Sequence, residues 1–363
     1  TIIYTLDGSV PEPENTSGTV YSYKNVYNST NSGPLLYAEY KTLGYSSPIQ
    51  ITDRSSQPNG ISQRTTTFGD GGYYKPQSPV FKGTVVRARL MRPGELPGPV
   101  VTHSYFVGAN AQSRYQLPVV SLSINEDDLF DYSKGLYTAG QDYEKWRTFA
   151  SFDGDGGTPA NYRRRSDTTE RPVNFELFTP AQGRVLSQNL GFRMHGGWSR
   201  SWPQKSFRLY ADSAYDTAAT LDYPLIPGLK GTGTGNPVNS FSRFIMRNAG
   251  NDHEGPRLRD AFIQELSKPL KIDMQGYQPA VHFINGEYWG LTDIRERIDR
   301  YFIASHHAVD PDKVAILSNN ADISEGTRQD RDDFQALGTF IASNDMTVAT
   351  NYSQVKQKMD VEN

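Results

Sequence analysis

The sequence predicts an α+β protein, in which a small N-terminal β-sandwich precedes a larger domain made of an antiparallel β meander and helices. Three observations lead to this class. A chain of 363 residues suits two domains of roughly 100 to 200 residues each, and therefore two cores. Its 32 glycines and 22 prolines favour short strands separated by many turns. Its 22 tyrosines and 17 phenylalanines can fill cores while keeping a polar edge near the surface.

The N-terminal domain is expected to span residues 1–109. Its segments IIYTL, TVVRARL and HSYFV read as short strands bounded by turn residues, a pattern typical of a small sandwich. Residues 28–79 are polar and rich in Ser, Asn, Gly and Gln, so we expect a long insertion outside the core. The small and polar residues 108–116 are the expected linker to a second domain, residues 117–363.

The second domain begins with the β meander. RPVNFELF, LGFRMH and QKSFRLY are three consecutive strand patterns joined by turn-rich segments, and FSRFIMRN predicts another strand. A hairpin turning at Asn285-Gly286 carries the strongest short-range turn signal in the chain. The segment PRLRDAFIQELSKPL predicts a helix with Leu258, Phe262 and Leu266 on one face, and residues 310–363 read as mostly helical.

Composition excludes several classes of function. There are 37 Lys and Arg against 40 Asp and Glu with no long block of one sign, so neither nucleic acid nor a polybasic membrane contact is expected. The sequence contains no run of 18 apolar residues, so it predicts no membrane span. The absence of cysteine rules out disulfides and thiolate metal sites, and the six histidines show no zinc-binding spacing. We therefore assign no metal ligand.

One glycine-containing loop carries candidate chemistry. In GFRMHGGWSRSWPQKSFRL, Gly196 and Gly197 allow a tight turn whose amides can face an anion, while Arg193, Arg200 and Lys205 add positive charge. The loop lacks the G-x-G-x-x-G pattern of kinases. From the residues alone, an ordinary hairpin with exposed basic side chains remains the alternative.

The first segment resembles a known accessory module. TIIYTLDGSVPEP and VVRARLMRPGELPGPVVTHSYFV are similar to the chitobiase/β-hexosaminidase C-terminal-type β-sandwich, whose Tyr-Thr-Leu-Asp-Gly-Ser-x-Pro signature matches residues 4–11. The resemblance implies a noncatalytic module of extracellular bacterial enzymes, with its opening strand missing here.

The second segment resembles the CotH kinase family, which is named for a spore-coat protein. Four stretches match in order, at residues 170–178, 191–211, 244–262 and 284–299. The resemblance implies an atypical protein-kinase-like fold, ATP and magnesium as cofactors, and phosphorylation of Ser or Thr in a protein substrate. It also implies an extracellular or bacterial cell-surface location.

The resemblance assigns nucleotide-binding roles to one set of residues: Arg193, Gly196, Gly197, Ser199, Arg200, Lys205 and Glu296. A kinase lysine needs a carboxylate to orient it, and the candidates are Glu296, which we favour, and Glu265. The family's Asn-x-Asp-Trp and Asp-x-Asp segments are expected beyond Asn363. We therefore assign no catalytic residue within this chain and expect the fragment alone to be inactive, with the C-terminal part of the domain missing.

Two other functions stay open. The chain is alternatively a noncatalytic surface or matrix protein that binds a glycan or a partner protein through the sandwich. A carbohydrate-active enzyme would need paired carboxylates in a recognisable context, and the sequence offers none.

Overall fold

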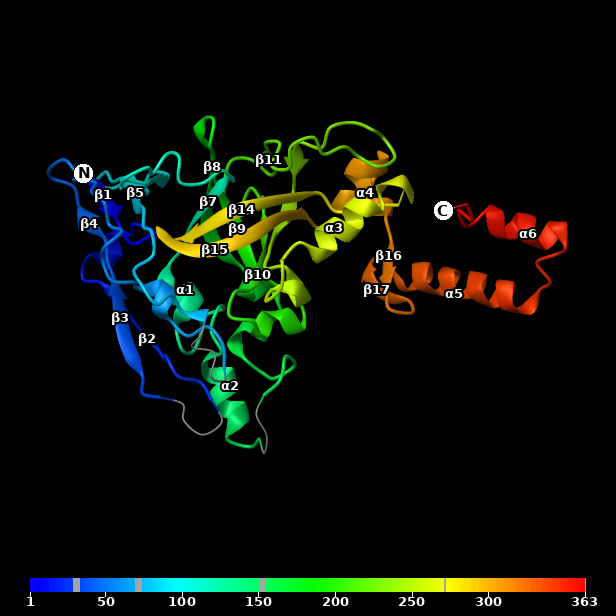
Figure 1. The fold of residues 1–363 in the computed structure, drawn as a ribbon, viewed down its shortest axis with the longest axis horizontal. Helices are drawn as coiled ribbons and strands as arrows, with labels where there is room; N and C mark the ends of the chain where they lie inside the picture. The colour runs from blue at the N-terminus through cyan, green and yellow to red at the C-terminus, as the bar shows by residue number, and fades with distance from the viewer. Residues whose placement is uncertain (29–32, 69–73, 151–153, 271, 363) are drawn as a thin grey trace.

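A computed structural model describes residues 1–28, 33–68, 74–150, 154–270 and 272–362. It confirms the α+β class, since six α-helices and several β-sheets lie within the described residues (Figure 1). The body of the molecule is built on β-sheets, and the last two helices, α5 and α6, extend away from it.

The N-terminal segment forms a four-stranded antiparallel sheet and a separate hairpin. The strand order in the sheet is β4-β1-β5-β6. Its strands are β1 (Ile2–Thr5), β4 (Leu43–Gly44), β5 (Thr84–Leu90) and β6 (Val101–Tyr105). The hairpin consists of β2 (Thr19–Tyr23) and β3 (Leu36–Tyr40). Whether these sheets make the accessory sandwich stays a prediction.

Residues 28–79 differ from the expected insertion. Their described part contains β3 and β4, and Tyr40 and Ile61 are buried in the main core. Polar residues of this segment can be buried because their hydroxyls form hydrogen bonds. Thr66 Oγ1 donates to Pro203 O over 2.7 Å, and Thr67 Oγ1 donates to Ser201 O over 2.5 Å. The expectation of a loop outside the core is therefore wrong for these residues; positions 29–32 and 69–73 lie outside the described part.

The second segment closes into a seven-stranded barrel. The strand order is β10-β13-β15-β14-β7-β8-β9, and β9 pairs with β10 to close the ring. The strands are β7 (Val119–Ser123), β8 (Arg171–Thr179), β9 (Gly183–His195), β10 (Ser206–Tyr210), β13 (Arg243–Arg247), β14 (Tyr277–Ile284) and β15 (Glu287–Glu296). The predicted meander is β8-β9-β10. All neighbours are antiparallel except β7 and β14, where Val119 lies opposite Val281.

The β14–β15 hairpin turns where the sequence predicts. Asn285 and Gly286 both have positive φ, 48° and 82°, as a two-residue hairpin turn of the primed type requires. The Asn285 side chain also binds the backbone of Ile124, accepting from its N–H over 3.0 Å and donating to its C=O over 2.9 Å. The turn therefore fixes the hairpin to the chain that follows β7.

One hydrophobic core spans both segments. Tyr21, Tyr40 and Ile61 from the N-terminal segment belong to the same buried cluster as Val120 and Phe175 from the barrel. Polar contacts cross the junction too: buried Glu176 accepts from Ser104 Oγ over 2.6 Å. The two segments therefore share a buried cluster, residues 108–116 connect them, and their division into two domains stays a prediction.

The helices and small sheets surround the barrel. The helices are α1 (Glu126–Phe130), α2 (Gly140–Arg147), α3 (Arg259–Leu266), α4 (Arg300–His307), α5 (Arg328–Ser343) and α6 (Ala349–Lys356). The two-stranded sheets are β11 (Leu221–Asp222) with β12 (Ser240–Phe241), and β16 (Ile316–Ser318) with β17 (Asp322–Glu325). Within the described ranges, no helix combines the length and apolar character needed to cross a membrane.

Helix α3 lies where its sequence pattern predicts a helix, but its apolar face is not buried. Leu258, Phe262 and Leu266 are 52%, 60% and 61% exposed. The spacing of these residues predicts one shared helix face. Such a face usually packs on the core of a globular protein, whereas here it is exposed.

Candidate functional site

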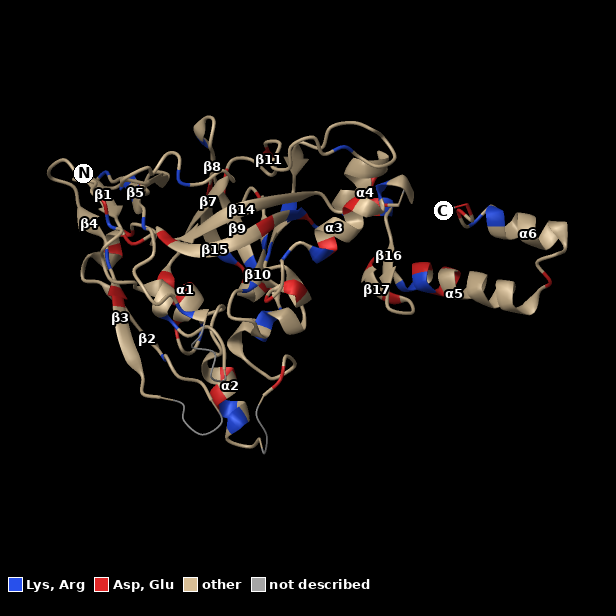
Figure 2. Cartoon of the chain, in the orientation of Figure 1, with Lys and Arg blue, Asp and Glu red and all other residues tan. Residues whose placement is uncertain are grey.

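The connection between β9 and β10 borders a basic hollow. Residues 196–205 form this connection and contain the short 3-10 helix Trp198–Ser201. The hollow has a volume of about 490 Å³ and is lined by Arg164, Arg165, Ser166, Thr169, Arg193, Met194, His195, Gly196, Gly197, Arg200 and Arg208. A neighbouring hollow of about 690 Å³ shares Arg193 and Arg208 and adds Arg243 and Arg297. In Figure 2 the blue Lys and Arg segments gather around β10.

Of the two predicted loop glycines, Gly196 has a strict geometric requirement. Its φ is +105°, and a Cβ there would lie 2.5 Å from Ser199 Oγ. A Cβ on Gly197 would meet open space. The loop conformation therefore depends on Gly196, and Ser199 contributes by packing against it.

Arg200 shapes the loop from the inside. The side chain is buried, and Nε donates to Gly196 O over 2.8 Å while Nη2 donates to Met194 O over 3.0 Å. Nη1 donates to Tyr162 O over 3.2 Å. Burial, followed by the neighbouring arginines, lowers the pKa of this guanidinium to about 10. Because backbone carbonyls use its N–H groups, Arg200 positions the loop.

His195 lies partly buried beside several arginines. Arg208 Nε donates to His195 Nδ1 over 2.8 Å, which places the proton of the neutral imidazole on Nε2. Burial, together with Arg208, Arg247 and other nearby arginines, lowers the pKa of His195 to about 3. Burial disfavours a charge of either sign, so the part of this shift that comes from the arginines is the part that would favour an anion.

The arginines of the hollow differ in how much of their charge is compensated. Arg193 pairs with Glu170 and with Asp167, the latter at 2.7 Å; these contacts outweigh its burial and raise the pKa of Arg193. Arg165 and Arg208 form no ion pair with any carboxylate of the described residues. Arg165 and Arg208 are therefore the cations most available to an anionic ligand.

Lys205 lies away from the basic hollow. The side chain is fully buried, with Nζ donating to Trp202 O over 2.7 Å and lying 4.1 Å from the centre of the Tyr162 ring. Burial lowers its pKa well below the ordinary value. No carboxylate among the described residues pairs with it, so its charged form is disfavoured by burial without an ion pair to offset the cost.

The structure does not bring Glu296 to Lys205. Glu296 accepts from Gly276 N over 2.8 Å and lies 2.9 Å from His306 Nε2. In the barrel it aligns through Phe244 with Leu209, four residues after Lys205 and so roughly 13 Å along the strand. The other candidate, Glu265, pairs with Lys268 on an exposed surface. The expected lysine–carboxylate pair is therefore not present in this structure.

Sequence reasoning missed Arg164, Arg165, His195 and Arg208 as members of one site. The run Arg163–Arg165 falls in a stretch without periodicity that reads only as a loop. The strand register offered a stronger signal, because Arg208 lies directly opposite Arg193 and one face of the β9–β10 pair collects these charges.

The fold and the site together define an α+β protein that carries a hollow lined by arginines on a closed β-barrel. A family model described as CotH kinase protein matches residues 192–363, just under half of the chain. The match includes the loop at 196–205, Arg208 and helix α3. Among curated proteins, none matches the chain.

Proposed function

We propose that the chain is part of a CotH-type kinase, located outside the cell or on a bacterial surface, that phosphorylates Ser or Thr in a protein substrate with ATP. The basic hollow would hold the phosphates of the nucleotide. The observation that carries this proposal is the hydrogen bond from Arg208, which has no carboxylate partner among the described residues, to His195, whose pKa is lowered by burial and by four nearby arginines.

The chemistry asked of these residues is electrostatic. Phosphoryl transfer depends mainly on positioning and on neutralising phosphate oxygens, and bidentate arginine N–H groups suit both tasks. Arg208 and Arg165 offer unpaired donors, and the neutral His195 offers its Nε2–H. Arg193 would have to exchange Asp167 or Glu170 for a phosphate. ATP, when bound, supplies the phosphoryl group.

The described residues offer no comparable set of ligands for magnesium. They contain no group of three or more His, Asp or Glu side chains that could hold a metal ion. We therefore derive no step through magnesium and assign no catalytic carboxylate to this part of the chain.

Calorimetric titration with ATP, together with the NMR titration of His195, tests the proposal. Bound phosphate compensates the arginines, so ATP is expected to raise the pKa of His195 from about 3. Arg208→Gln should weaken ATP binding about tenfold or more, since it removes a charge-assisted hydrogen bond. The control Arg92→Gln changes an exposed arginine paired only with Glu95 and should leave binding unchanged. Equal affinity in both variants would refute the site.

The noncatalytic surface protein is a second candidate, and one observation favours it. A cavity with an aromatic lining lies where the N-terminal segment meets the barrel. Tyr74, Tyr288 and Trp289 line this cavity, whereas arginines dominate the lining of the basic hollow.

A further inference from the structure

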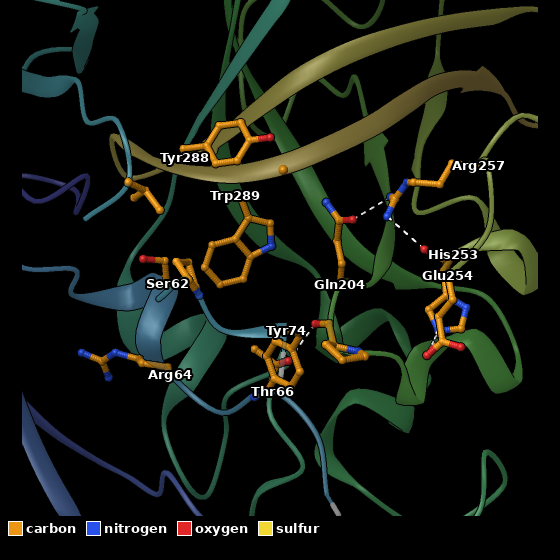
Figure 3. A pocket seen from close by; sticks show the side chains of 14 residues that line it. Ser62, Arg64, Thr66, Tyr74, Gln204, His253, Glu254, Arg257, Tyr288 and Trp289 are labelled. Atoms are coloured by element: carbon orange, nitrogen blue, oxygen red, sulfur yellow. Dashed lines mark hydrogen bonds and ion pairs between the residues drawn. The ribbon is translucent and has the colours of Figure 1, made fainter. Parts of the chain in front are cut away.

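A cavity of about 680 Å³ lies at the junction of the two segments (Figure 3). One side is lined by residues of the N-terminal segment: Ser62, Arg64, Thr66, Tyr74, Pro76 and Val80. The barrel contributes Tyr288, Trp289 and Gly290 from β15, and the segments at 203–204 and 253–257 complete the lining. The volume lies in the range of about 300 to 1,000 Å³ that is common for small-molecule sites.

Trp289 is the fixed aromatic surface of this cavity. Its Nε1 donates to the hydroxyl of Tyr137 over 3.1 Å, and the two rings meet edge to face with centres 5.5 Å apart. The Tyr137 hydroxyl is itself held, because it accepts from the backbone N–H of Lys205 over 2.7 Å. The indole is therefore anchored from behind. Figure 3 shows it between Ser62 and Gln204 in this view.

Arg257 adds a fixed positive charge at the edge of the cavity. Nη2 donates to Gln204 Oε1 over 2.7 Å and to Leu291 O over 2.9 Å, and Nη1 donates to His253 O over 3.4 Å. Its φ is +63°, which is unusual for a residue with a side chain. No described carboxylate forms an ion pair with it. The carboxylate on the rim, Glu254, lies 3.6 Å from His253 instead. The charge of Arg257 is thus held in place by carbonyl oxygens, while Asp293 interacts with it only through space.

Ser62 supplies an unused polar group. The residue is 9% exposed, and its buried hydroxyl has no hydrogen-bond partner. A buried hydroxyl without a partner is uncommon in folded proteins. Because the oxygen itself is buried, a rotation about χ1 of Ser62 is needed to turn this hydroxyl toward a ligand in the cavity.

We infer that this cavity binds a carboxylated sugar ring, the uronic acid residue of an acidic glycan. The indole of Trp289 offers a flat face for the C–H groups of a sugar ring, Ser62 offers its hydroxyl to a ring hydroxyl, and Arg257 complements the carboxylate. An extended peptide is less suited. The barrel strands β14 and β15 are paired on both sides, so no free strand edge is offered for backbone pairing.

The experiment uses the whole chain and two kinds of probe. Calorimetry and Trp fluorescence compare trimers of galacturonic and glucuronic acid with the neutral hexose trimers of the same linkage. At least one uronate trimer should bind at least tenfold more tightly than its neutral counterpart. Arg257→Gln should remove this preference, and Ser62→Ala should weaken binding severalfold.

Trp289→Ala should abolish binding of both kinds of trimer, while the control Phe149→Ala, which alters an aromatic residue that is 90% exposed, should bind like the unchanged protein. Thermal unfolding checks that each variant folds, and Arg257→Gln decides the matter if Trp289→Ala does not. Equal binding of acidic and neutral trimers, no binding of either, or tighter Trp289-dependent binding of a glutamate-rich peptide would overturn the assignment. ATP affinity is read separately and does not bear on it.

Discussion

Replacing His282 should make the protein more resistant to acid. His282 lies in β14 opposite Gly290 and Val120, is fully buried, and has its ring centre 5.4 Å from that of Phe207. Neither ring nitrogen has a hydrogen-bond partner. Burial lowers the pKa of His282 to about 3.

The sign and the size follow from proton linkage. The unfolded chain takes up a proton on this histidine near pH 6.5, whereas the folded protein does so only near pH 3. The stability contributed by His282 is therefore complete above pH 6.5 and is lost as the pH falls toward 3. Each pH unit in this window costs about 1.4 kcal/mol, so about 2.7 kcal/mol is lost between pH 6.5 and pH 4.5.

Urea unfolding at pH 7 and pH 4.5 measures this loss. The unchanged protein should lose about 2.7 kcal/mol more of its free energy of unfolding between the two pH values than His282→Leu does. The other titrating groups, His195 included, are present in both proteins and cancel in the comparison. The same pH dependence in both proteins would show that His282 is protonated in the folded state and refute the reasoning.

Three further outcomes are expected from unfolding measurements. Gly196→Ala should cost about 1 to 3 kcal/mol because of its positive φ and the contact with Ser199, whereas Gly197→Ala should cost less than about 1 kcal/mol; equal costs would contradict the loop geometry. Lys205→Met should stabilise the protein at pH 7, because burial lowers the pKa of this amine below its value in the unfolded chain, and the gain should shrink as the pH rises toward 10.5; a loss of stability at pH 7 would count against this cost of burial. Asn285→Ala should cost about 2 kcal/mol, since it removes both backbone contacts of the side chain and the residue type that tolerates positive φ; a change below about 0.5 kcal/mol would oppose this role.

The sequence predicts those parts of the fold that depend on neighbours along the chain. The Asn285-Gly286 turn and the β8-β9-β10 meander follow from local turn chemistry and alternation. Closure of the barrel cannot be predicted in this way. Val119 pairs with Val281, and neither local sequence indicates which distant strand it pairs with. The polar composition of residues 28–79 led to the wrong prediction of a loop outside the core. Composition does not show that Thr66 and Thr67 donate hydrogen bonds to carbonyl groups of a distant loop.

The candidate site was predictable to a similar extent. Its place at the β9–β10 loop was predicted by Gly196 and the surrounding arginines. The burial of Lys205 was not, because it depends on the Tyr162 ring and the carbonyl of Trp202. A charged residue type indicates what a side chain can do in water, and only the packing decides whether water reaches it.

The single parallel pair in the barrel has a consequence for how the chain folds. Seven strands cannot form a ring with every neighbour antiparallel, so one seam has to be parallel, and it joins β7 to β14. During synthesis, β7 and β8 are made long before their ring can close, and β7 keeps an open edge until β14 has emerged. Such a late, long-range pairing slows folding and leaves an aggregation-prone intermediate. The ring can close only after β14 and β15, the last two of its strands along the chain, have been made.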